Sequence, residues 1–274
     1  EVRPAVDYRQ AARNNHYPNF QQAMRNNPTR SPYDPDSETG YNVWINESLD
    51  YNVVADAMLE DYYGLDKWFK PEVNLKLNIK PIPGLNYQQV VGYENRQWEL
   101  HQYWPSTHRS EIDNSRKGHA HLAFSKTENL TSEGYFSYVK DFKGGHNLNA
   151  TAGYSYFEVN GENFGMDNYN FSVDGIKYWD IGQGSYLTDG KAGMSSGKSV
   201  TERLFSFFAR ANYSYQDKYM LSASIRHEGS SKFAADNRWA NFWSATAGWR
   251  ISNEEFMKDF DWLDDLKIRL RCDR

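Results

Sequence analysis

The sequence predicts an all-β fold built from antiparallel, up-and-down strands. Three observations lead to this prediction. Aromatic residues make up 16% of the 274 residues while the mean hydropathy is only -0.85, a composition that favours half-buried strands. Apolar and polar residues alternate over runs of about ten residues, and strand side chains alternate between two faces. Short turns also alternate along the chain with long polar connections.

Residues 1–70 show no clear alternation and are expected to form an entry segment and outer loop. Residues 71–274 are expected to hold the strands, with tight turns at 81–84, 143–146 and 216–218, where Gly, Pro and Asp favour chain reversal. The eight expected strands each place apolar residues on one face and polar residues on the other. They cover residues 73–80, 85–98, 132–142, 147–159, 204–215, 219–226, 240–251 and 266–270.

The connections between these hairpins are long and rich in Gly, Ser, Asn, Trp and Tyr. They are expected at 99–131, 160–201 and 227–239. Residues 119–126, inside the first of them, also alternate. Counting them as a separate spanning strand would break the alternation of short and long connections, so we interpret them as a β extension within the loop.

Several features favour a transmembrane barrel of partial circumference, with the long loops outside the cell. The runs match the length of a tilted spanning strand. Three arginines, Arg210, Arg226 and Arg250, fall on polar faces, whereas an arginine facing lipid at mid-depth would cost about 2–4 kcal/mol. Aromatic residues lie near the ends of the apolar faces, as in interfacial girdles: Tyr213, Tyr215, Tyr219, Trp243 and Trp249.

Composition limits the other classes. The net charge of -5 gives no reason to expect nucleic acid as a partner, and no run approaches the roughly 18 apolar residues of a spanning helix. A single cysteine, Cys272, excludes a disulfide framework. A soluble β-rich carbohydrate-binding or glycoside hydrolase domain remains the alternative, because a soluble sandwich also alternates.

Short sequence motifs give evidence beyond the periodicity. Residues 212–224 read NYSYQDKYMLSAS, and an Arg-x-x-Gly-Ser-Ser-basic-Phe loop and an Asn-Arg-Trp segment follow. This order resembles the SusC/RagA family of TonB-linked outer-membrane proteins of Bacteroidetes. The matching positions, expected to be structural, are Arg226, Gly229, Ser230, Ser231, Phe233, Asn237, Arg238, Phe242, Ser244 and Trp249. The resemblance runs from about residue 20 to about residue 270 and is weaker in the long loops.

The resemblance implies an outer-membrane importer of oligosaccharides or similarly bulky nutrients, surrounded by outer-membrane lipid. The implied partners are a SusD-like surface lipoprotein, a glycan or peptide ligand, and the TonB complex acting through a plug segment. No plug domain or aromatic-ended closing strand is recognisable, and eight strands cannot close a 22-stranded lumen, so we expect an internal piece of a larger barrel. No catalytic residue, metal or cofactor is expected, and the protein is not expected to be an enzyme.

Aromatic residues in or beside the long loops are the candidate ligand contacts, because flat rings can stack on sugars and amphipathic Tyr and Trp favour binding surfaces. The candidates are Tyr103, Trp104, Tyr178, Trp179 and Trp239. Packing of these rings on one another is the competing interpretation.

Three other motifs are better explained by local structure than by a nucleotide, metal or catalytic site. Residues 192–199 spell a phosphate-loop pattern, but a loop precedes them and no helix is expected to follow, so a flexible loop is favoured. His101, His108, His119 and His121 crowd one loop, where exposed histidines are favoured over a metal site. The adjacent acids Glu254 and Glu255, like the pair at 264–265, are expected to be solvated turn charges rather than catalytic carboxylates.

Overall fold

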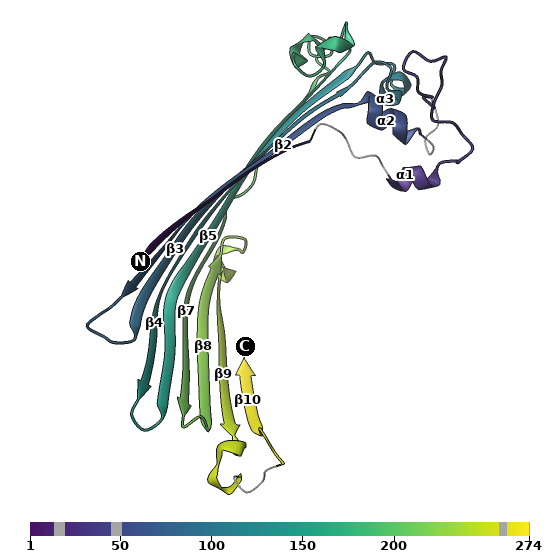
Figure 1. The fold of residues 1–274 in the computed structure, drawn as a ribbon. Helices are drawn as coiled ribbons and strands as arrows, with labels where there is room; N and C mark the ends of the chain where they lie inside the picture. Colours follow the sequence, from purple (N-terminus) through teal and green to yellow (C-terminus); the bar gives the residue numbers. More distant parts are fainter. Residues whose placement is uncertain (14–19, 45–50, 258–261, 274) are drawn as a thin grey trace.

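The computed structural model describes residues 1–13, 20–44, 51–257 and 262–273, and it contains one large curved antiparallel sheet (Figure 1). Nine strands follow one another across the sheet in chain order, and β6 pairs with residues 162–167 of β5. The strands are β1 Val2–Arg13, β2 Asp61–Asn78, β3 Leu85–Trp104, β4 His119–Phe142, β5 His146–Tyr169, β6 Gly193–Lys198, β7 Glu202–Tyr215, β8 Tyr219–Ser230, β9 Trp239–Arg250 and β10 Lys267–Asp273.

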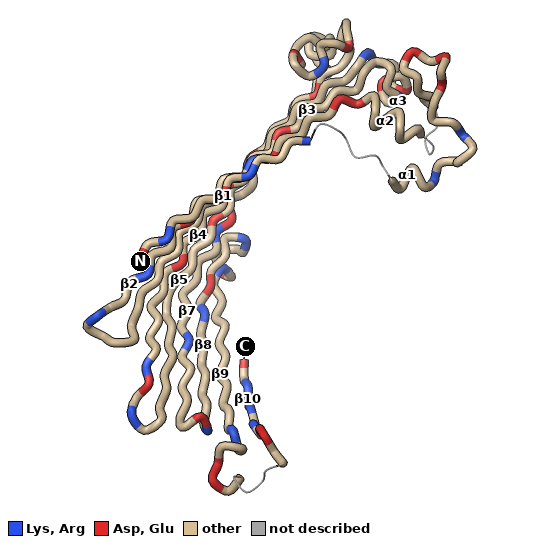
Figure 2. Tube along the Cα trace, in the orientation of Figure 1, with Lys and Arg blue, Asp and Glu red and all other residues tan. Residues whose placement is uncertain are grey.

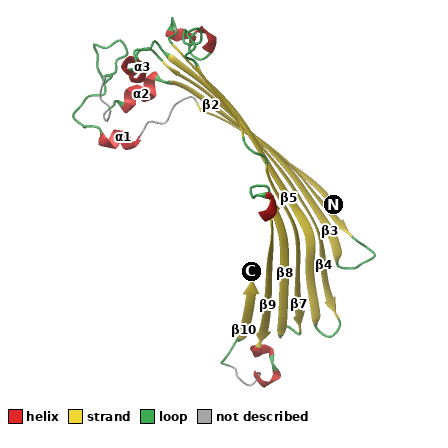
Figure 3. Ribbon diagram, turned by 180° about the vertical axis from the view of Figure 1, so that it is seen from behind, coloured by secondary structure: helices red, strands yellow, loops and turns green. Residues whose placement is uncertain are grey.

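The helices are short and lie away from the broad part of the sheet. α1 Phe20–Arg25, α2 Val53–Leu59 and α3 Arg109–Asp113 gather near the far ends of β2, β3 and β4 (Figures 1 and 3). Single 3₁₀ turns occur at Asp174–Ile176, Ile181–Gln183, Ala235–Asn237, Ile251–Asn253 and Glu255–Met257. Within the described part of the chain, no helix has the length and apolar character needed to cross a membrane.

The tight hairpin turns lie at one end of the strands, which we call the turn edge, together with the longer β9–β10 connection that holds the 3₁₀ turns Ile251–Asn253 and Glu255–Met257 (Figure 1). The connections between β3 and β4, between β5 and β7 and between β8 and β9 lie at the opposite end, the loop edge. Two turns need backbone with positive φ. Gly144 and Gly145 have φ values of 85° and 82°, and Gln216 and Asp217 have values of 50° and 52°. Positive φ at consecutive turn residues matches the right-handed twist of the flanking strands, which explains why these turns can be so short.

All eight expected strands are present, which confirms the antiparallel, up-and-down prediction. The long loops were expected to be longer than they are. The connections are reduced to residues 105–118 between β3 and β4, 170–201 (which include β6) between β5 and β7, and 231–238 between β8 and β9. The predictions of loops at 99–131, 160–201 and 227–239 were therefore wrong in their bounds.

The first loop is shorter than predicted because β4 begins earlier and pairs continuously with its neighbours. The alternating segment 119–126 is not an extension inside a loop. It is the beginning of the 24-residue strand β4, which pairs without a break with both β3 and β5. Polar residues at 127–129 and 131–133 obscured this continuity, because backbone pairing on both sides stabilises a polar stretch of strand as well as an apolar one.

The interpretation of residues 1–70 as an entry segment and loop was also wrong at its two ends. Residues 2–13 form β1, which pairs with β2 from Val2 opposite Leu75 to Arg13 opposite Gly64, and β2 begins at Asp61. Pro4 lies within β1, and an edge strand tolerates a proline because one side of the strand donates no ladder hydrogen bonds.

The two faces of the broad part of the sheet differ in chemistry and in exposure. On β8, Leu221, Ala223 and Ile225 are exposed, whereas Ser222 and Ser224 on the opposite face are partly buried. Side chains converge on the concave face of a curved sheet and spread on the convex one. The polar face is therefore the concave, inner face, and the apolar face is the convex, outer face.

The apolar rows of this part of the sheet are not tucked into a two-layer core, as a soluble sandwich would require. Among the residues that the structure describes, a compact core of buried residues occurs at the loop edge, where Tyr103, Ala120, Phe171 and Tyr178 pack together. The charge distribution agrees with this arrangement. Figure 2 shows long stretches without charge in the lower parts of β7, β8 and β9, while charged residues gather at turns and towards the loop edge.

Candidate functional site

The outer face is bounded by two levels that are ten residues apart on each of five strands. At the turn edge, Phe142, His146, Tyr215, Tyr219 and Trp249 lie opposite one another in register across β4, β5, β7, β8 and β9. At the second level the register aligns Ser132, Tyr156, Phe205, Gly229 and Trp239.

The separation of these levels matches a membrane. Ten residues at about 3.3 Å each give about 33 Å along a strand, and a tilt of about 40° reduces this to a height of about 25 Å. An apolar band of about 25 Å is the height found in outer-membrane barrels. Between the levels, the outward-facing residues of these described strands include one charged side chain, Lys140, and it lies two residues from the turn-edge level.

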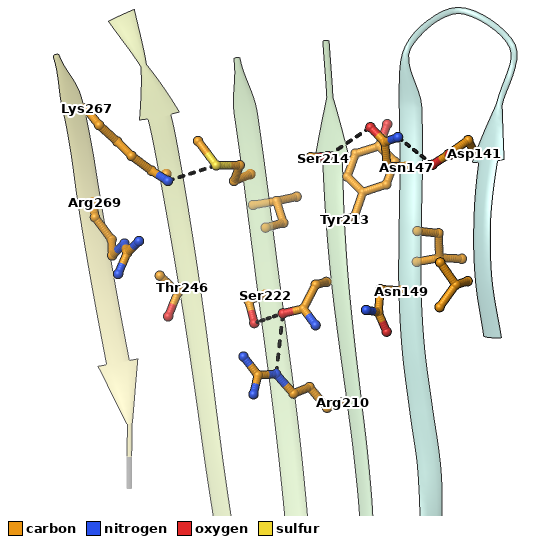
Figure 4. A pocket seen from close by; sticks show the side chains of 16 residues that line it. Asp141, Asn147, Asn149, Arg210, Tyr213, Ser214, Ser222, Thr246, Lys267 and Arg269 are labelled. Atoms are coloured by element: carbon orange, nitrogen blue, oxygen red, sulfur yellow. Dashed lines mark hydrogen bonds between the residues drawn. The ribbon is translucent and has the colours of Figure 1, made fainter. Parts of the chain in front are cut away.

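The inner face holds a polar hollow of about 410 Å³ near the turn edge. Figure 4 shows Arg210, Lys267 and Arg269 around it, together with amide and hydroxyl side chains from β5, β7, β8 and β9. The Ser222 hydroxyl donates to Asn212 Oδ1 at 2.7 Å, and Arg210 Nε lies 3.4 Å from the same oxygen. The lining can therefore offer several hydrogen-bond donors to a solute in the lumen.

At the loop edge, ion pairs and hydrogen bonds join the connections into one cluster. Asp174 accepts hydrogen bonds from the Tyr103 hydroxyl at 2.7 Å and from the Ser106 hydroxyl at 2.6 Å. Lys177 pairs with Asp61 at the beginning of β2. These contacts fix the 170–192 segment against the ends of β2 and β3.

A stack of rings lies on the inner side of the same cluster. His119 lies between Trp104 and Tyr169, with ring centroids 4.5 and 4.2 Å away, and the Arg116 guanidinium lies 4.5 Å from the Tyr169 centroid. Arg116 also makes a two-pronged pair with the fully buried Glu111, at 2.9 and 2.7 Å. Charge pairing of this kind is what allows a carboxylate to be buried.

His108 is the buried N-cap residue of α3. Its Nδ1 accepts from the Ser110 amide at 3.2 Å, and Nε2 lies 3.3 Å from Asp56 Oδ1 in an orientation that does not form a hydrogen bond. Burial, with smaller contributions from Arg109 and His119, lowers the pKa of His108 to about 4. The imidazole is therefore neutral at neutral pH.

Comparison with known proteins identifies the relatives of this sheet. No protein-family model matches the chain. TonB-dependent receptor P39 of Formosa agariphila is 30% identical over 200 residues, which cover 70% of this chain and 18% of that protein. TonB-dependent receptor SusC of Bacteroides thetaiotaomicron is 42% identical over 82 residues, which cover 30% of this chain and 8% of SusC.

The chain belongs to the SusC/RagA family of TonB-dependent receptors. The fold agrees: the structure of the RagAB peptide importer in its closed-closed state matches with a TM-score of 0.71 at 19% identity, over 87% of this chain and 26% of the other. The chain spans about a fifth of the length of the curated relatives that it matches first. The predicted resemblance is thus confirmed.

The SusC/RagA sequence pattern has a structural explanation around the β8–β9 connection. A Cβ atom at Gly229 would lie 2.8 Å from the Trp239 ring, so glycine allows this ring to lie over the backbone, where it stacks on His227 at 4.7 Å. Ser231 accepts from the Arg203 amide at 2.8 Å, and Arg238 donates to the Phe233 carbonyl at 3.2 Å.

Other residues of the same pattern make polar contacts within β8, between β8 and β9, and from β9 to the turn after it. Ser244 Oγ lies 2.8 Å from Ser224 Oγ, and Trp249 donates to Glu254 at 3.0 Å. Arg226 pairs with Glu228 at 2.6 Å on the inner face.

The predicted ligand contacts are distributed over different environments. Tyr103 and Tyr178 are 2% and 7% exposed and belong to the loop-edge core, so their rings have no free face for a ligand. Trp239 lies on the outer face at the second level. Trp104 lies on the inner side, stacked on His119, and Trp179 is 76% exposed on the 170–192 segment.

The remaining motifs have structural roles. Residues 193–198 form β6, so the phosphate-loop spelling is a strand rather than the flexible loop expected. His119 and His121 point the same way, as predicted, and both contact Asp167 Oδ1, at 2.8 and 2.9 Å, but they are not exposed loop residues. Among the described residues, no group of three or more His, Cys, Asp or Glu is arranged to hold a metal ion.

Sequence reasoning missed two arrangements. Glu254 is not a solvated turn charge: it accepts from Tyr219, Lys218 and Trp249, at 2.7, 2.9 and 3.0 Å. These bonds, the Tyr219 bond first, lower the pKa of Glu254 to about 2. The basic hollow was also missed, because only the register of β10 against β9 brings the cations at 267 and 269 to the face that carries Arg210.

Proposed function

We propose that the chain forms part of the wall of an outer-membrane TonB-dependent importer that takes up oligosaccharides or similarly bulky nutrients. In this proposal the turn edge faces the periplasm and the loop edge faces the outside of the cell. The wall carries no catalytic chemistry. Transport energy reaches it from the TonB complex through a plug segment, and a SusD-like surface lipoprotein captures the ligand.

One observation carries the membrane part of the proposal. The outer face is apolar over a height of about 25 Å and ends at two levels that carry Tyr, Trp and His side chains, as lipid-facing barrel walls do. The opposite face carries Arg, Asn and Ser side chains around a hollow. Such a face requires water, because an unpaired charge in an apolar medium is costly.

The strands that continue beyond the second level support a role in ligand capture. From Tyr156 to Tyr169, β5 extends 13 residues, or about 40 Å, past the proposed membrane boundary. Trp179, exposed near this end, and Trp104 on the inner side are the proposed aromatic contacts for sugar rings.

A peptide cargo is the second candidate. It is favoured by the fold likeness to a structure described as the RagAB peptide importer. Both candidates use the same wall and loops, and they differ in the solute that is carried.

The test is growth of a strain that lacks the complete receptor gene on a panel of single glycans and of peptides. Failure to grow on one glycan class, restored by the intact gene, is the expected result, and failure confined to peptides would select the second candidate. Fractionation should recover the receptor in the outer membrane with heat-modifiable migration. A receptor recovered in the soluble fraction would refute the proposal.

A further inference from the structure

A single charged side chain lies within the apolar band that the five described strands form on the outer face. It is Lys140 of β4, two residues from the turn-edge level at Phe142, or about 5 Å inside the band. Lys140 Nζ lies 5.2 Å from the centroid of the Phe142 ring and makes no ion pair with a residue that the structure describes. Because a charge that faces an apolar medium is costly without a partner, this ammonium group requires an anion or water from outside these strands.

The partner of Lys140 must approach from the outer side of the wall. β4 lies between β3 and β5, and both belong to this chain, so strands from elsewhere in the receptor cannot lie beside Lys140. A segment inside the lumen would contact the opposite, inner face. The neighbouring acid, Asp141, belongs to that inner face and accepts a hydrogen bond from Asn147 at 2.6 Å. The proposed function places lipid on the side towards which Lys140 points.

The turns on both sides of Lys140 are also basic. Lys80 lies in the β2–β3 turn and Lys143 in the β4–β5 turn, and both are exposed and make no ion pair with a described residue. On the described strands β4, β5, β7, β8 and β9, no acid faces outward between the two levels. A lysine ammonium group is a common partner of phosphate, so the charge of this rim is complementary to phospholipid headgroups.

An apolar groove of about 470 Å³ begins beside Lys140 on the outer face. Alanines of β5 and β7 form its floor, and larger side chains of β4 and β8 form its two sides: Ala150, Ala152, Ala211, Phe136, Tyr138 and Ile225. Tyr138 lies on the same face as Lys140 and two residues from it. The cation and the groove are therefore neighbours on one surface.

The cation and the groove follow one another in depth as the parts of a phospholipid do. Ala150 and Ala152 lie four and six residues from the turn-edge level at His146, or about 10–15 Å inside the band. Lys140, at about 5 Å, is nearer the surface. The groove volume is also within the range of small-molecule sites, about 300–1,000 Å³. A phosphate at the lysine thus leaves an acyl chain at the depth of the alanines.

We infer that this surface binds one glycerophospholipid of the periplasmic leaflet, with its phosphate on Lys140 and an acyl chain in the groove. The inference rests on the proposed outer-membrane location and orientation, and it adds a specific lipid site to them. A second copy of the chain that presented the same face would bring no acid to Lys140, because the outward residues between the levels of the described strands include no other charge.

Native mass spectrometry of the complete receptor, purified in detergent and freed of lipid, measures the affinity for two probes. Dioleoylphosphatidylglycerol carries a phosphate, and dioleoylglycerol has the same acyl chains without it. The variants are Lys140→Gln, which removes the cation, and Ala211→Leu, which fills the groove. The matched controls are Lys76→Gln on the inner face of β2 and Ala247→Leu, which lies on the outer face of β9 beyond the groove.

We expect dioleoylphosphatidylglycerol to bind the wild type about ten times more tightly than dioleoylglycerol, because only the former offers an acceptor for a charge-assisted hydrogen bond. Lys140→Gln should remove that advantage and leave the affinity for dioleoylglycerol unchanged. Ala211→Leu should weaken the binding of both lipids about ten-fold, since the larger side chain takes the place of buried methylene groups. Both control variants should bind like the wild type.

Other results would overturn the inference. Equal affinity of the wild type for the two lipids would do so, and this measurement needs no variant. Unchanged lipid binding in both Lys140→Gln and Ala211→Leu would also overturn it. A receptor dimer that Ala211→Leu dissociates, with no effect on phospholipid binding, would show that a second copy covers the groove instead. Heat-modifiable migration checks that each variant is folded before its affinity is measured.

The outcomes also separate this inference from the import proposal. A receptor that is recovered in the outer membrane and supports growth, but binds the two lipids equally, refutes the lipid site and leaves import standing. A receptor recovered in the soluble fraction refutes both.

Discussion

Ala152 lies near mid-depth on the outer face and offers a direct test of the lipid-facing assignment. It is four residues from the second level at Tyr156 and six from the turn-edge level at His146. At about 3.3 Å per residue and a tilt of about 40°, this places it about 10 Å from the nearer boundary. Substitution of Ala152 by Arg should therefore destabilise the folded barrel by about 2–4 kcal/mol, the cost of an arginine near the midplane.

The matched control is Ser137→Arg. Ser137 lies on the adjacent strand β4 at nearly the same depth, five residues from Phe142, but on the inner face. The Ser137→Arg substitution should change the free energy of unfolding by no more than about 0.5 kcal/mol, as for a substitution on a water-exposed surface.

The assay is unfolding of the complete receptor in lipid vesicles across a urea series, with heat-modifiable gel migration as the measure of the folded fraction. The Ala152 variant should unfold at a lower urea concentration than the Ser137 variant. If the two variants unfold together, or if the Ser137 variant is the weaker, the assignment of outer and inner faces is wrong.

Three further predictions concern the edges of the sheet. Glu254→Gln should lower the melting temperature at pH 7. The pKa of Glu254 in the folded protein is about 2, below the usual 4.5, so the stability advantage of the wild type should be lost as pH falls from about 4.5 towards 2. A difference in melting temperature that does not depend on pH would contradict this. Gly229→Ala should cost about 1–3 kcal/mol in unfolding experiments, since the new Cβ meets the Trp239 ring. Trp239→Ala should suppress that cost. Gly175→Ala should cost less, because its Cβ would make only an ordinary contact with Val173 Cγ1 at 3.8 Å. For His108, folding is favoured by the neutral ring, so the protection factors for amide hydrogen exchange in residues 105–118 should fall as pH falls from about 6.5 to 4, and His108→Gln should remove that fall.

The strands within the proposed membrane could be predicted from sequence because one physical constraint acts on every second residue there. Leu221, Ala223 and Ile225 face one side in strict alternation, and the Arg-x-x-Gly-Ser-Ser pattern identified the family. Neither prediction needed knowledge of distant contacts.

The parts that could not be predicted depend on contacts between distant residues. Beyond the second level, which is the membrane boundary in our proposal, no lipid would impose a pattern on β4 and β5, and the polar stretch at 127–129 gave no strand signal although it pairs on both sides. Glu254 and its partner Tyr219 are 35 residues apart. The burial of Tyr103 and Tyr178 likewise follows from the return of the 170–192 segment onto the ends of β3 and β4.

The length of β4 and β5 has a mechanical consequence. Each strand runs as one hydrogen-bonded element from the turn edge to the ring stack at the loop edge. Because β4 and β5 are paired along their whole length, a displacement of the ring stack should also tilt the parts of these strands near the turn edge. In the proposed orientation, a ligand held at the loop edge would therefore act on the wall through these same two strands.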